Sequence, residues 1–136
     1  MTELRIVLAA VERPLADAWE RFCDDLEFVT VHRGSILDVA ADAVVSPANS
    51  YGFMDGGIDA LYVDHFGDDI QLRVRRQIHD HHAGELLVGM ADIVETGHSA
   101  IPFLIAAPTN GGAARTRNRR RPNRVQHLRA PSSRGN

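Results

Sequence analysis

At 136 residues the chain is long enough for one hydrophobic core and too short for two, and its apolar fraction of 44% and charged fraction of 24% are typical of soluble globular proteins. No apolar run is long enough to cross a bilayer, the N-terminus lacks a signal-peptide pattern, and the single cysteine excludes an internal disulfide, so we expect a cytoplasmic protein with no membrane partner. The net charge of −3 is unevenly distributed, because all 18 acids precede Pro108 whereas eight of the 15 basic residues, all arginines, follow Thr109. The part of the chain before Thr109 is therefore acidic and repels a nucleic-acid backbone, so only the C-terminal segment could bind one.

Strand and helix patterns alternate along the first 109 residues. A strand over 4–9 is followed by Pro14 and a helix over 15–26, whose apolar side chains at helical spacing predict a buried face: Leu15, Ala18, Trp19, Phe22 and Leu26. The other expected elements are strands over 28–32, 42–46, 91–95 and 103–107 and helices over 59–66 and 68–82, broken at Gly67. This alternation predicts an α/β domain over residues 1–109, with a central sheet covered on both faces.

Residues 110–136 have a different composition from the rest of the chain. They contain no acid and no Phe, Trp or Tyr, and show no apolar periodicity. Such a segment cannot bury enough surface to offset the entropy of ordering it, which predicts disorder. One hypothesis is that an out-of-frame or degenerate sequence begins at Asn110, and the alternative is a basic tail that binds RNA, DNA or an acidic partner.

A glycine-rich loop follows the strand over 42–46 and leads into a helix. Ligands of open α/β sheets bind beyond the carboxyl ends of strands, where such loops lie. Gly52, Gly56 and Gly57 permit positive φ and close approach of the backbone to a ligand, and a helix starting near Ile58 offers unpaired N–H groups to an anion. The pattern therefore indicates a phosphate site, although glycines after a strand more often form a simple turn.

Two polar residues flank this loop. Asn49 both donates and accepts hydrogen bonds, which suits a hydroxylated sugar, but alone it would more often be a turn or cap residue. Asp59 could accept from a sugar hydroxyl or hold a water, and as a first-turn acid it also complements the helix dipole. Together with the glycines, the two side chains point to a sugar phosphate more specifically than any of them does alone.

The run from Gly34 to Gly67 resembles the first half of a macro domain, the ADP-ribose-binding fold that includes the Appr-1-p processing family. The matching segments are the turn Gly34-Ser35-Ile36, the strand from Asp42 to Val45, the pair Ala48-Asn49, the loop and helix start Gly56-Gly57-Ile58-Asp59, and the helix end Phe66-Gly67. Residues 86–91 and 101–108 are similar to later segments of the family. The resemblance implies a three-layer α/β/α fold with a mixed sheet. That fold is incomplete here, because the family's remaining helices, strand and second glycine-rich loop are not recognisable after Thr109.

The resemblance also implies a ligand-binding set. Asn49 would contact the distal ribose, and Gly56, Gly57 and Ile58 would donate main-chain N–H groups to the diphosphate and ribose. The set is completed by Ser35, Ile36 and Ala48. Ser35 stands where the family usually has an acid that accepts from the adenine amino group, and a hydroxyl accepts less strongly.

The activity implied by the resemblance is hydrolysis of an ADP-ribosyl linkage or of ADP-ribose 1''-phosphate, without a cofactor. Asp59 would orient or activate a water, with Asn49 beside it as the second catalytic residue. The partner would be ADP-ribose or an ADP-ribosylated protein. A non-catalytic ADP-ribose reader and an inactive truncated remnant with a nucleic-acid-binding tail are the alternatives.

A histidine cluster is the other candidate for chemistry. His79, His81 and His82 with Asp80 contain metal-ligating side chains, but a solvated helix end with a favourable dipole explains them, so we expect no metal. No nucleophile with a flanking histidine and acid is recognisable, so nothing supports covalent catalysis.

Overall fold

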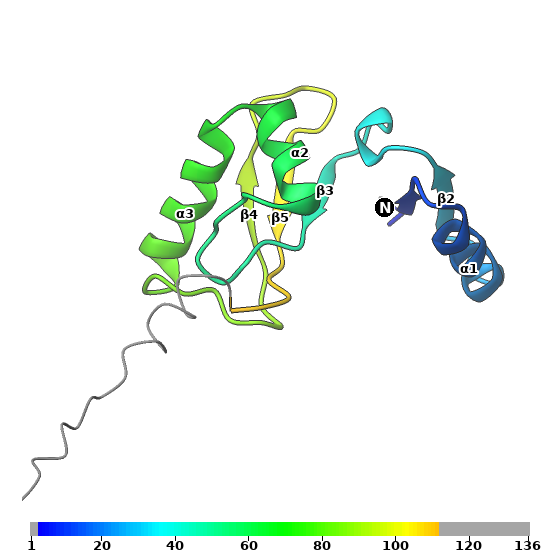
Figure 1. Cartoon of the computed structure of the whole chain (residues 1–136), viewed down its shortest axis with the longest axis horizontal. Helices are drawn as coiled ribbons and strands as arrows, with labels where there is room; N and C mark the ends of the chain where they lie inside the picture. The colour runs from blue at the N-terminus through cyan, green and yellow to red at the C-terminus, as the bar shows by residue number, and fades with distance from the viewer. Residues whose placement is uncertain (1–2, 112–136) are drawn as a thin grey trace, which may run out of the picture.

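The computed structural model describes residues 3–111 (Figure 1). The elements in chain order are β1 (Ile6–Ala10), α1 (Arg13–Cys23), β2 (Val29–Arg33), the short 3₁₀ helix η1 (Ile36–Asp38), β3 (Ala43–Ser46), α2 (Gly57–Phe66), α3 (Asp69–His81), β4 (Asp92–Glu95) and β5 (Phe103–Ala106). Each expected strand and helix is confirmed, with ends that shift by a few residues, and η1 is additional. The protein is therefore mixed α/β, and the expected disorder of the tail concerns residues that lie almost entirely outside the described ones.

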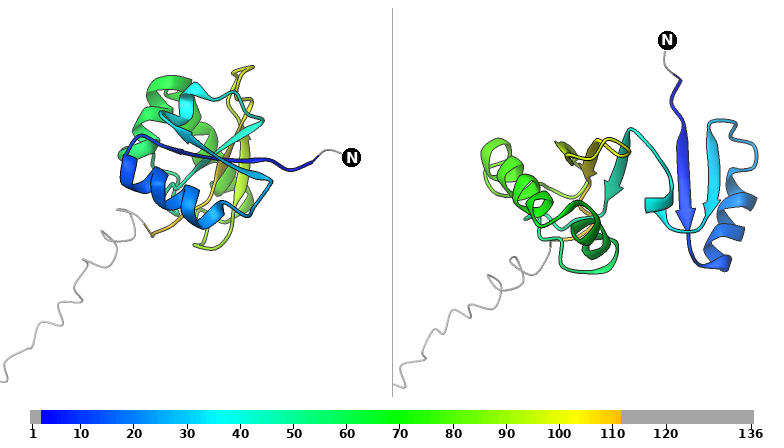
Figure 2. Two further views of the ribbon diagram at one scale, coloured as in Figure 1. Left: turned by 90° about the vertical axis from the view of Figure 1, so that its right-hand side faces the viewer. Right: turned by 90° about the horizontal axis from the view of Figure 1, so that it is seen from above.

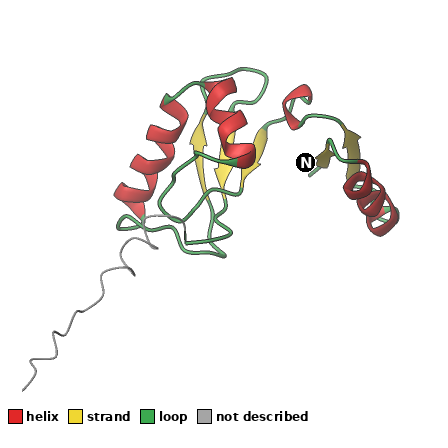
Figure 3. Cartoon of the chain, viewed as in Figure 1, coloured by secondary structure: helices red, strands yellow, loops and turns green. Residues whose placement is uncertain are grey.

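The strands form two sheets, not one (Figure 3). β1 and β2 pair in parallel, while β3, β5 and β4 form a second sheet in that order, with β3 parallel and β4 antiparallel to β5. The prediction of a single central sheet is therefore wrong for the described residues, because neither β1 nor β2 pairs with a strand of the second sheet. We call residues 3–33 the N-terminal lobe and residues 43–111 the C-terminal lobe, and Figure 2 shows them as separate units joined by the connection 34–42.

The hydrophobic core lies in the C-terminal lobe. α2 and α3 cover one face of the three-stranded sheet (Figure 1). The buried cluster consists of Val44, Met54, Tyr62, Phe66, Ile70, Val74, Ile78, Leu86, Ile101, Leu104 and Ala106. Its α3 members recur every four residues, which is the spacing of one helical face. Among residues 3–111 nothing covers the sheet's other face, since Val45 is 53% and Ile93 49% exposed, so the prediction of a sheet covered on both faces is also wrong for these residues.

The N-terminal lobe buries far less. Within its described residues only Ala10 and Ala16 are buried, and Phe22 is 75% exposed. The predicted buried face of the first helix is therefore wrong at Leu15, Phe22 and Leu26, which are exposed, while Ala18 and Trp19 are half-buried. Two strands form too narrow a sheet to cover the apolar face of α1, and within the described residues nothing else covers it.

Candidate functional site

The loop of residues 47–56 joins β3 to α2, and Asn49 holds it in shape. Asn49 Oδ1 accepts from Tyr51 N at 3.0 Å and from Phe53 N at 3.1 Å, and Asn49 Nδ2 donates to Phe53 O at 3.3 Å. The turn interpretation of Asn49 is thus confirmed. An amide carries two N–H donors, so within the described part of the chain one Nδ2 hydrogen remains for a ligand.

The segment after β5 runs beside this loop. Asn110 O accepts from Ser50 N at 3.1 Å and from Ser50 Oγ at 3.3 Å, and Asn49 and Asn110 form a parallel bridge. Thr109 Oγ1 donates to Pro47 O at 3.5 Å. The segment after β5 is therefore attached to the loop through Asn110, which is the first residue of the tail expected from the sequence.

The glycines of the loop have different roles. A Cβ at Gly52 would lie 3.0 Å from Arg75 Cγ and 3.1 Å from Ile78 Cδ1, so Gly52 permits close packing of the loop on α3. A Cβ at Gly56 or Gly57 would meet no atom of residues 3–111 within 4 Å. Gly57 also has φ +57°, a conformation that favours glycine. The open approach to the loop therefore lies at Gly56 and Gly57.

α2 begins at this opening. Its N-cap residue is Gly56, which has no side chain to accept from the N–H groups of the first turn. Those groups carry the partial positive charge of the helix N-terminus. Ile58, the second residue of α2, is half-buried and packs against the core, which fixes the direction of the first turn.

Asp59 lies beneath the same turn and is buried, with 6% of its surface exposed. Ser46 Oγ donates a hydrogen bond to Asp59 Oδ1 and accepts from the N–H of Ala48 at 3.2 Å. Burial raises the pKa of the Asp59 carboxyl above its ordinary value; the Ser46 hydrogen bond partly offsets this, and the charge of Asp55 adds to it. The acid thus connects the end of β3 to the start of α2.

Two residues of the site had no functional prediction, Ser46 and Tyr62. The Tyr62 hydroxyl donates to Val45 O at 3.0 Å, and burial, reinforced by the charge of Asp59, raises the pKa of Tyr62 to about 12. Ser46 could have been found as the polar residue that ends an apolar strand. Tyr62 could have been placed near Asp59 because residues three apart share a helix face.

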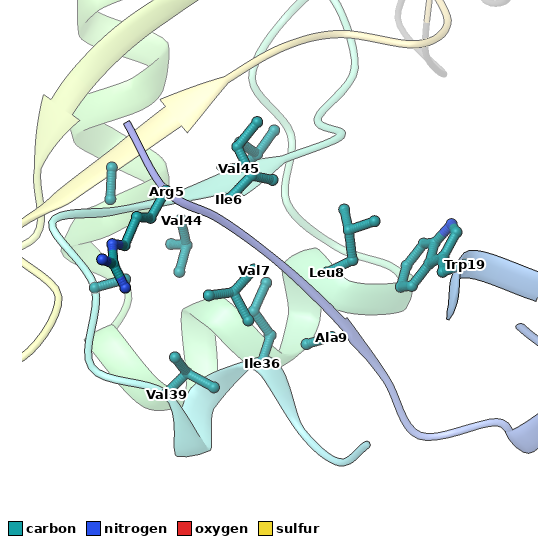
Figure 4. A pocket seen from close by; sticks show the side chains of 12 residues that line it. Arg5, Ile6, Val7, Leu8, Ala9, Trp19, Ile36, Val39, Val44 and Val45 are labelled. Atoms are coloured by element: carbon teal, nitrogen blue, oxygen red, sulfur yellow. The ribbon is translucent and has the colours of Figure 1, made fainter. Parts of the chain in front are cut away.

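The predicted ligand-binding residues and the predicted catalytic Asp59 separate into two places. Ala48, Asn49, Gly56, Gly57, Ile58 and Asp59 belong to the loop and the start of α2. Ser35 and Ile36 lie in the connection between the lobes, where Ser35 Oγ caps η1 by accepting from Leu37 N at 3.2 Å. Ile36 lines a cavity of about 340 Å³ between β1 and β3 (Figure 4). The local loop was thus predicted as a unit.

The histidine cluster joins α3 to β4. His82 Nε2 lies 2.7 Å from Asp92 Oδ2, and Gln77 Nε2 donates to the same oxygen at 3.2 Å. Burial raises the pKa of Asp92, but its hydrogen bonds with His82, the N–H of Ile93 and Gln77 outweigh burial, so the pKa lies below its ordinary value. Among residues 3–111 no three His, Cys, Asp or Glu side chains are placed to hold a metal ion.

No protein-family model matches this chain. The chain is 32% identical over 81 residues to an uncharacterized protein from Aquifex aeolicus (strain VF5). The match covers 60% of this chain and 46% of that protein, so the chain spans less than half the length of its relative. In the described part of the chain, no helix combines the length and the apolar character needed to cross a membrane.

Proposed function

We propose that this protein binds ADP-ribose, free or attached to a protein, through the loop 47–56 and the first turn of α2. The observation that carries the proposal is the start of α2 at Gly56 and Gly57, which has no side-chain cap and which the described part of the chain leaves open. N–H groups at such a helix start donate to phosphate oxygens, and the helix dipole favours the negative charge. The macro-domain resemblance of residues 34–67 favours ADP-ribose among phosphorylated ligands.

The groups around this opening suit the sugar next to a diphosphate. The remaining Nδ2 hydrogen of Asn49 can donate to a ribose hydroxyl. The amide is already held by Tyr51 and Phe53, so its orientation is set before the ligand arrives. We place this binding activity in the cytoplasm, because a chain with one cysteine gains nothing from an oxidising compartment.

The proposal extends to hydrolysis through Asp59. A buried carboxylate with a raised pKa takes up a proton more readily than an exposed one, as a general base acting on water requires. Asp59→Asn keeps an oxygen that accepts from Ser46 and removes the base. We expect it to abolish release of ADP-ribose from a modified protein, or of phosphate from ADP-ribose 1''-phosphate, while ADP-ribose affinity persists. Wild-type binding without turnover would make the protein a reader, with Asp59 a structural anchor.

A calorimetric titration with ADP-ribose tests the binding proposal, and AMP, which lacks the diphosphate, is the control ligand. Gly56 has φ −149° and ψ 159°, an extended conformation that valine adopts, and a Cβ there meets no described residue within 4 Å. Gly56→Val should therefore fold normally and weaken ADP-ribose binding by on the order of tenfold or more, because its methyl groups occupy the path of the phosphate. Ala60→Val, at an exposed position of the same helix, is the matched control.

Either of two results would contradict the binding proposal. The first is equal affinity for ADP-ribose and AMP. The second is ADP-ribose binding that Gly56→Val leaves at the level of the Ala60→Val control.

The charge distribution favours a second candidate, nucleic-acid binding by the arginines between Arg115 and Arg134. All eight follow a body with seven arginines and 18 acids. Binding by such a segment falls steeply with salt, by a slope that reports the number of neutralised phosphates. Removal of residues 112–136 should abolish RNA and DNA binding and leave ADP-ribose binding unchanged.

A further inference from the structure

Two unpaired strand edges face each other between the lobes. Within residues 3–111, β1 pairs only with β2, and β3 pairs only with β5 on one side. Residues 5–9 and residues 43–45 both line the cavity of about 340 Å³, and Figure 4 labels Ile6, Val7 and Val45 among the lining side chains. The free edge of β1 and the free edge of β3 therefore both border this cavity, which we call the interlobe gap.

Hydrogen bonds identify the main-chain groups of β1 that face the gap. Ile6 N donates to Phe28 O at 2.8 Å, and Ala10 O accepts from Gly34 N at 2.9 Å, so the even-numbered residues of β1 point toward β2. Successive residues of a strand direct their main-chain groups to opposite sides. The N–H and C=O groups of Val7 consequently face the interlobe gap.

The same alternation applies to β3. Ser46 O accepts from Ala107 N at 2.9 Å, so the even-numbered residues of β3 point toward β5. Val45 therefore directs its N–H toward the gap, and its C=O is held by the Tyr62 hydroxyl. Each edge thus offers main-chain groups that another strand can bind.

The side chains at both edges are apolar and uncovered. Ile6 is 37%, Val7 38% and Val45 53% exposed. Parallel strands are normally covered on both faces, and a two-stranded sheet is marginally stable by itself. Only an extended polypeptide with apolar side chains both satisfies the free main-chain groups and buries Ile6, Val7 and Val45.

We propose that the occupant is a second copy of this chain, and that the two copies exchange lobes. β1 of one copy pairs with β3 of the other, and the reverse pairing occurs at the same time, so that each sheet has the order β2-β1-β3-β5-β4. Each copy supplies both edges of matching apolar character, and the exchange pairs all four of these β1 and β3 edges around a two-fold axis, while the outer edges of β2 and β4 are unchanged.

The connection 34–42 is suited to act as the hinge of the exchange. η1 is its only helical or strand element, and Ala41 N donates to Ala100 O at 3.1 Å, so the connection is anchored to the C-terminal lobe. The N-terminal lobe contributes no residue to the buried core cluster. Moving this lobe onto a second copy therefore breaks little packing within the first.

Sedimentation of the full chain over a concentration series tests the proposal. We expect the wild-type chain to form a dimer. Val7→Pro and Val45→Pro should each weaken the affinity of this dimer by on the order of tenfold or more. Each proline removes an N–H that faces the gap and leaves the β1–β2 or the β3–β5 ladder intact. Val31→Pro is the matched control, because odd-numbered residues of β2 face the outer edge. A chain that stays monomeric, or a dimer weakened by Val31→Pro and not by the other two, would overturn the proposal.

A crosslinking measurement covers the case in which a proline variant fails to fold. In a Cys23→Ser background, chains carrying Ile6→Cys are mixed with chains carrying Val45→Cys and oxidised, because in a parallel pairing of β1 with β3 the even-numbered residues of β1 share a face with the odd-numbered residues of β3. Exchange predicts disulfide-linked dimers between the two kinds of chain, and few from either kind alone. Equal crosslinking of each kind with itself would overturn the β1–β3 pairing.

Discussion

The two lobes contain the same kinds of element and differ in what these elements bury. α1 lies against two parallel strands, and in that lobe only Ala10 and Ala16 are buried. α2 and α3 lie against three strands, and the buried cluster of the protein is assembled there. Local sequence pattern thus produces a helix or a strand in either lobe, whereas a core forms only where enough elements converge on one another.

The lobes also differ in how polar side chains fasten a strand to a helix. In the N-terminal lobe, Arg33 donates to the carboxylate of Glu20 at 2.8 Å, and all of these atoms lie at the surface. In the C-terminal lobe the equivalent link is the buried hydrogen bond between Ser46 and Asp59. Water competes with the first link and is excluded from the second, so we expect the two to differ in strength.

The largest expected difference between the lobes concerns leucine truncation. Leu104 is fully buried, so Leu104→Ala should lower the free energy of unfolding by about 2–5 kcal/mol through lost burial and the cavity that remains. Leu15, on α1, is 43% exposed, and Leu15→Ala should lower the free energy of unfolding by only about 0.5 kcal/mol. Urea denaturation of both variants measures the contrast. Similar losses would mean that the N-terminal lobe has a core which the present fold does not contain.

The elements could be predicted because their signals are local. The apolar residues Ile70, Val74 and Ile78 place one face of α3 by spacing alone, and Gly67 separates α2 from α3 as expected. The division into two sheets could not be predicted, because strand order depends on contacts between residues far apart in the sequence. The exposure of Phe22 follows from that division, since its spacing on α1 is the same whether or not a partner covers it.

The candidate site divides in the same way. The loop residues from Ala48 to Asp59 were predicted together because they are neighbours in the sequence. The link from Asp59 to Ser46 spans 13 positions, and no spacing rule specifies it. Asn49 shows a further limit, because the residue type allowed both a turn and a ligand contact, and only the bonds to Tyr51 and Phe53 show that the turn is formed.

The second prediction compares the two polar links. Ser46→Ala removes the hydroxyl from a buried carboxylate, so we expect the free energy of unfolding to fall by about 1.5–3 kcal/mol. Arg33→Ala breaks a surface link and should have a small effect that shrinks further as salt is added. Thermal unfolding at low and high salt measures both. A larger loss from Arg33→Ala than from Ser46→Ala would contradict the difference between a surface link and a buried one.

The smallest expected effect is a pH dependence that reports on the C-terminal lobe, where both carboxyls with shifted pKa values lie, Asp59 and Asp92. The pKa of Asp92 is lowered in the folded state, so its stabilisation is present above its unfolded-state pKa and is lost as the pH falls through the folded value. The pKa of Asp59 is raised, so its contribution is greatest below its unfolded-state pKa and is lost as the pH rises through the folded value. The two carboxyls therefore give stability profiles of opposite slope.

Substitutions at the two carboxyls should remove these slopes separately. Asp92→Asn should flatten the acid-side loss of stability, and Asp59→Asn should flatten the decline toward neutral pH, when unfolding free energies are measured from acid to neutral pH.

His82→Ala should lower stability by about 1 kcal/mol, because it removes a hydrogen bond of the Asp92 carboxylate. His79→Ala is the matched control, since among residues 3–111 His79 bonds only to the exposed Asp80. If both histidine variants lost equal stability, the link from α3 to β4 would contribute nothing beyond surface charge, and the C-terminal lobe would depend on its apolar core and on the Ser46–Asp59 bond alone.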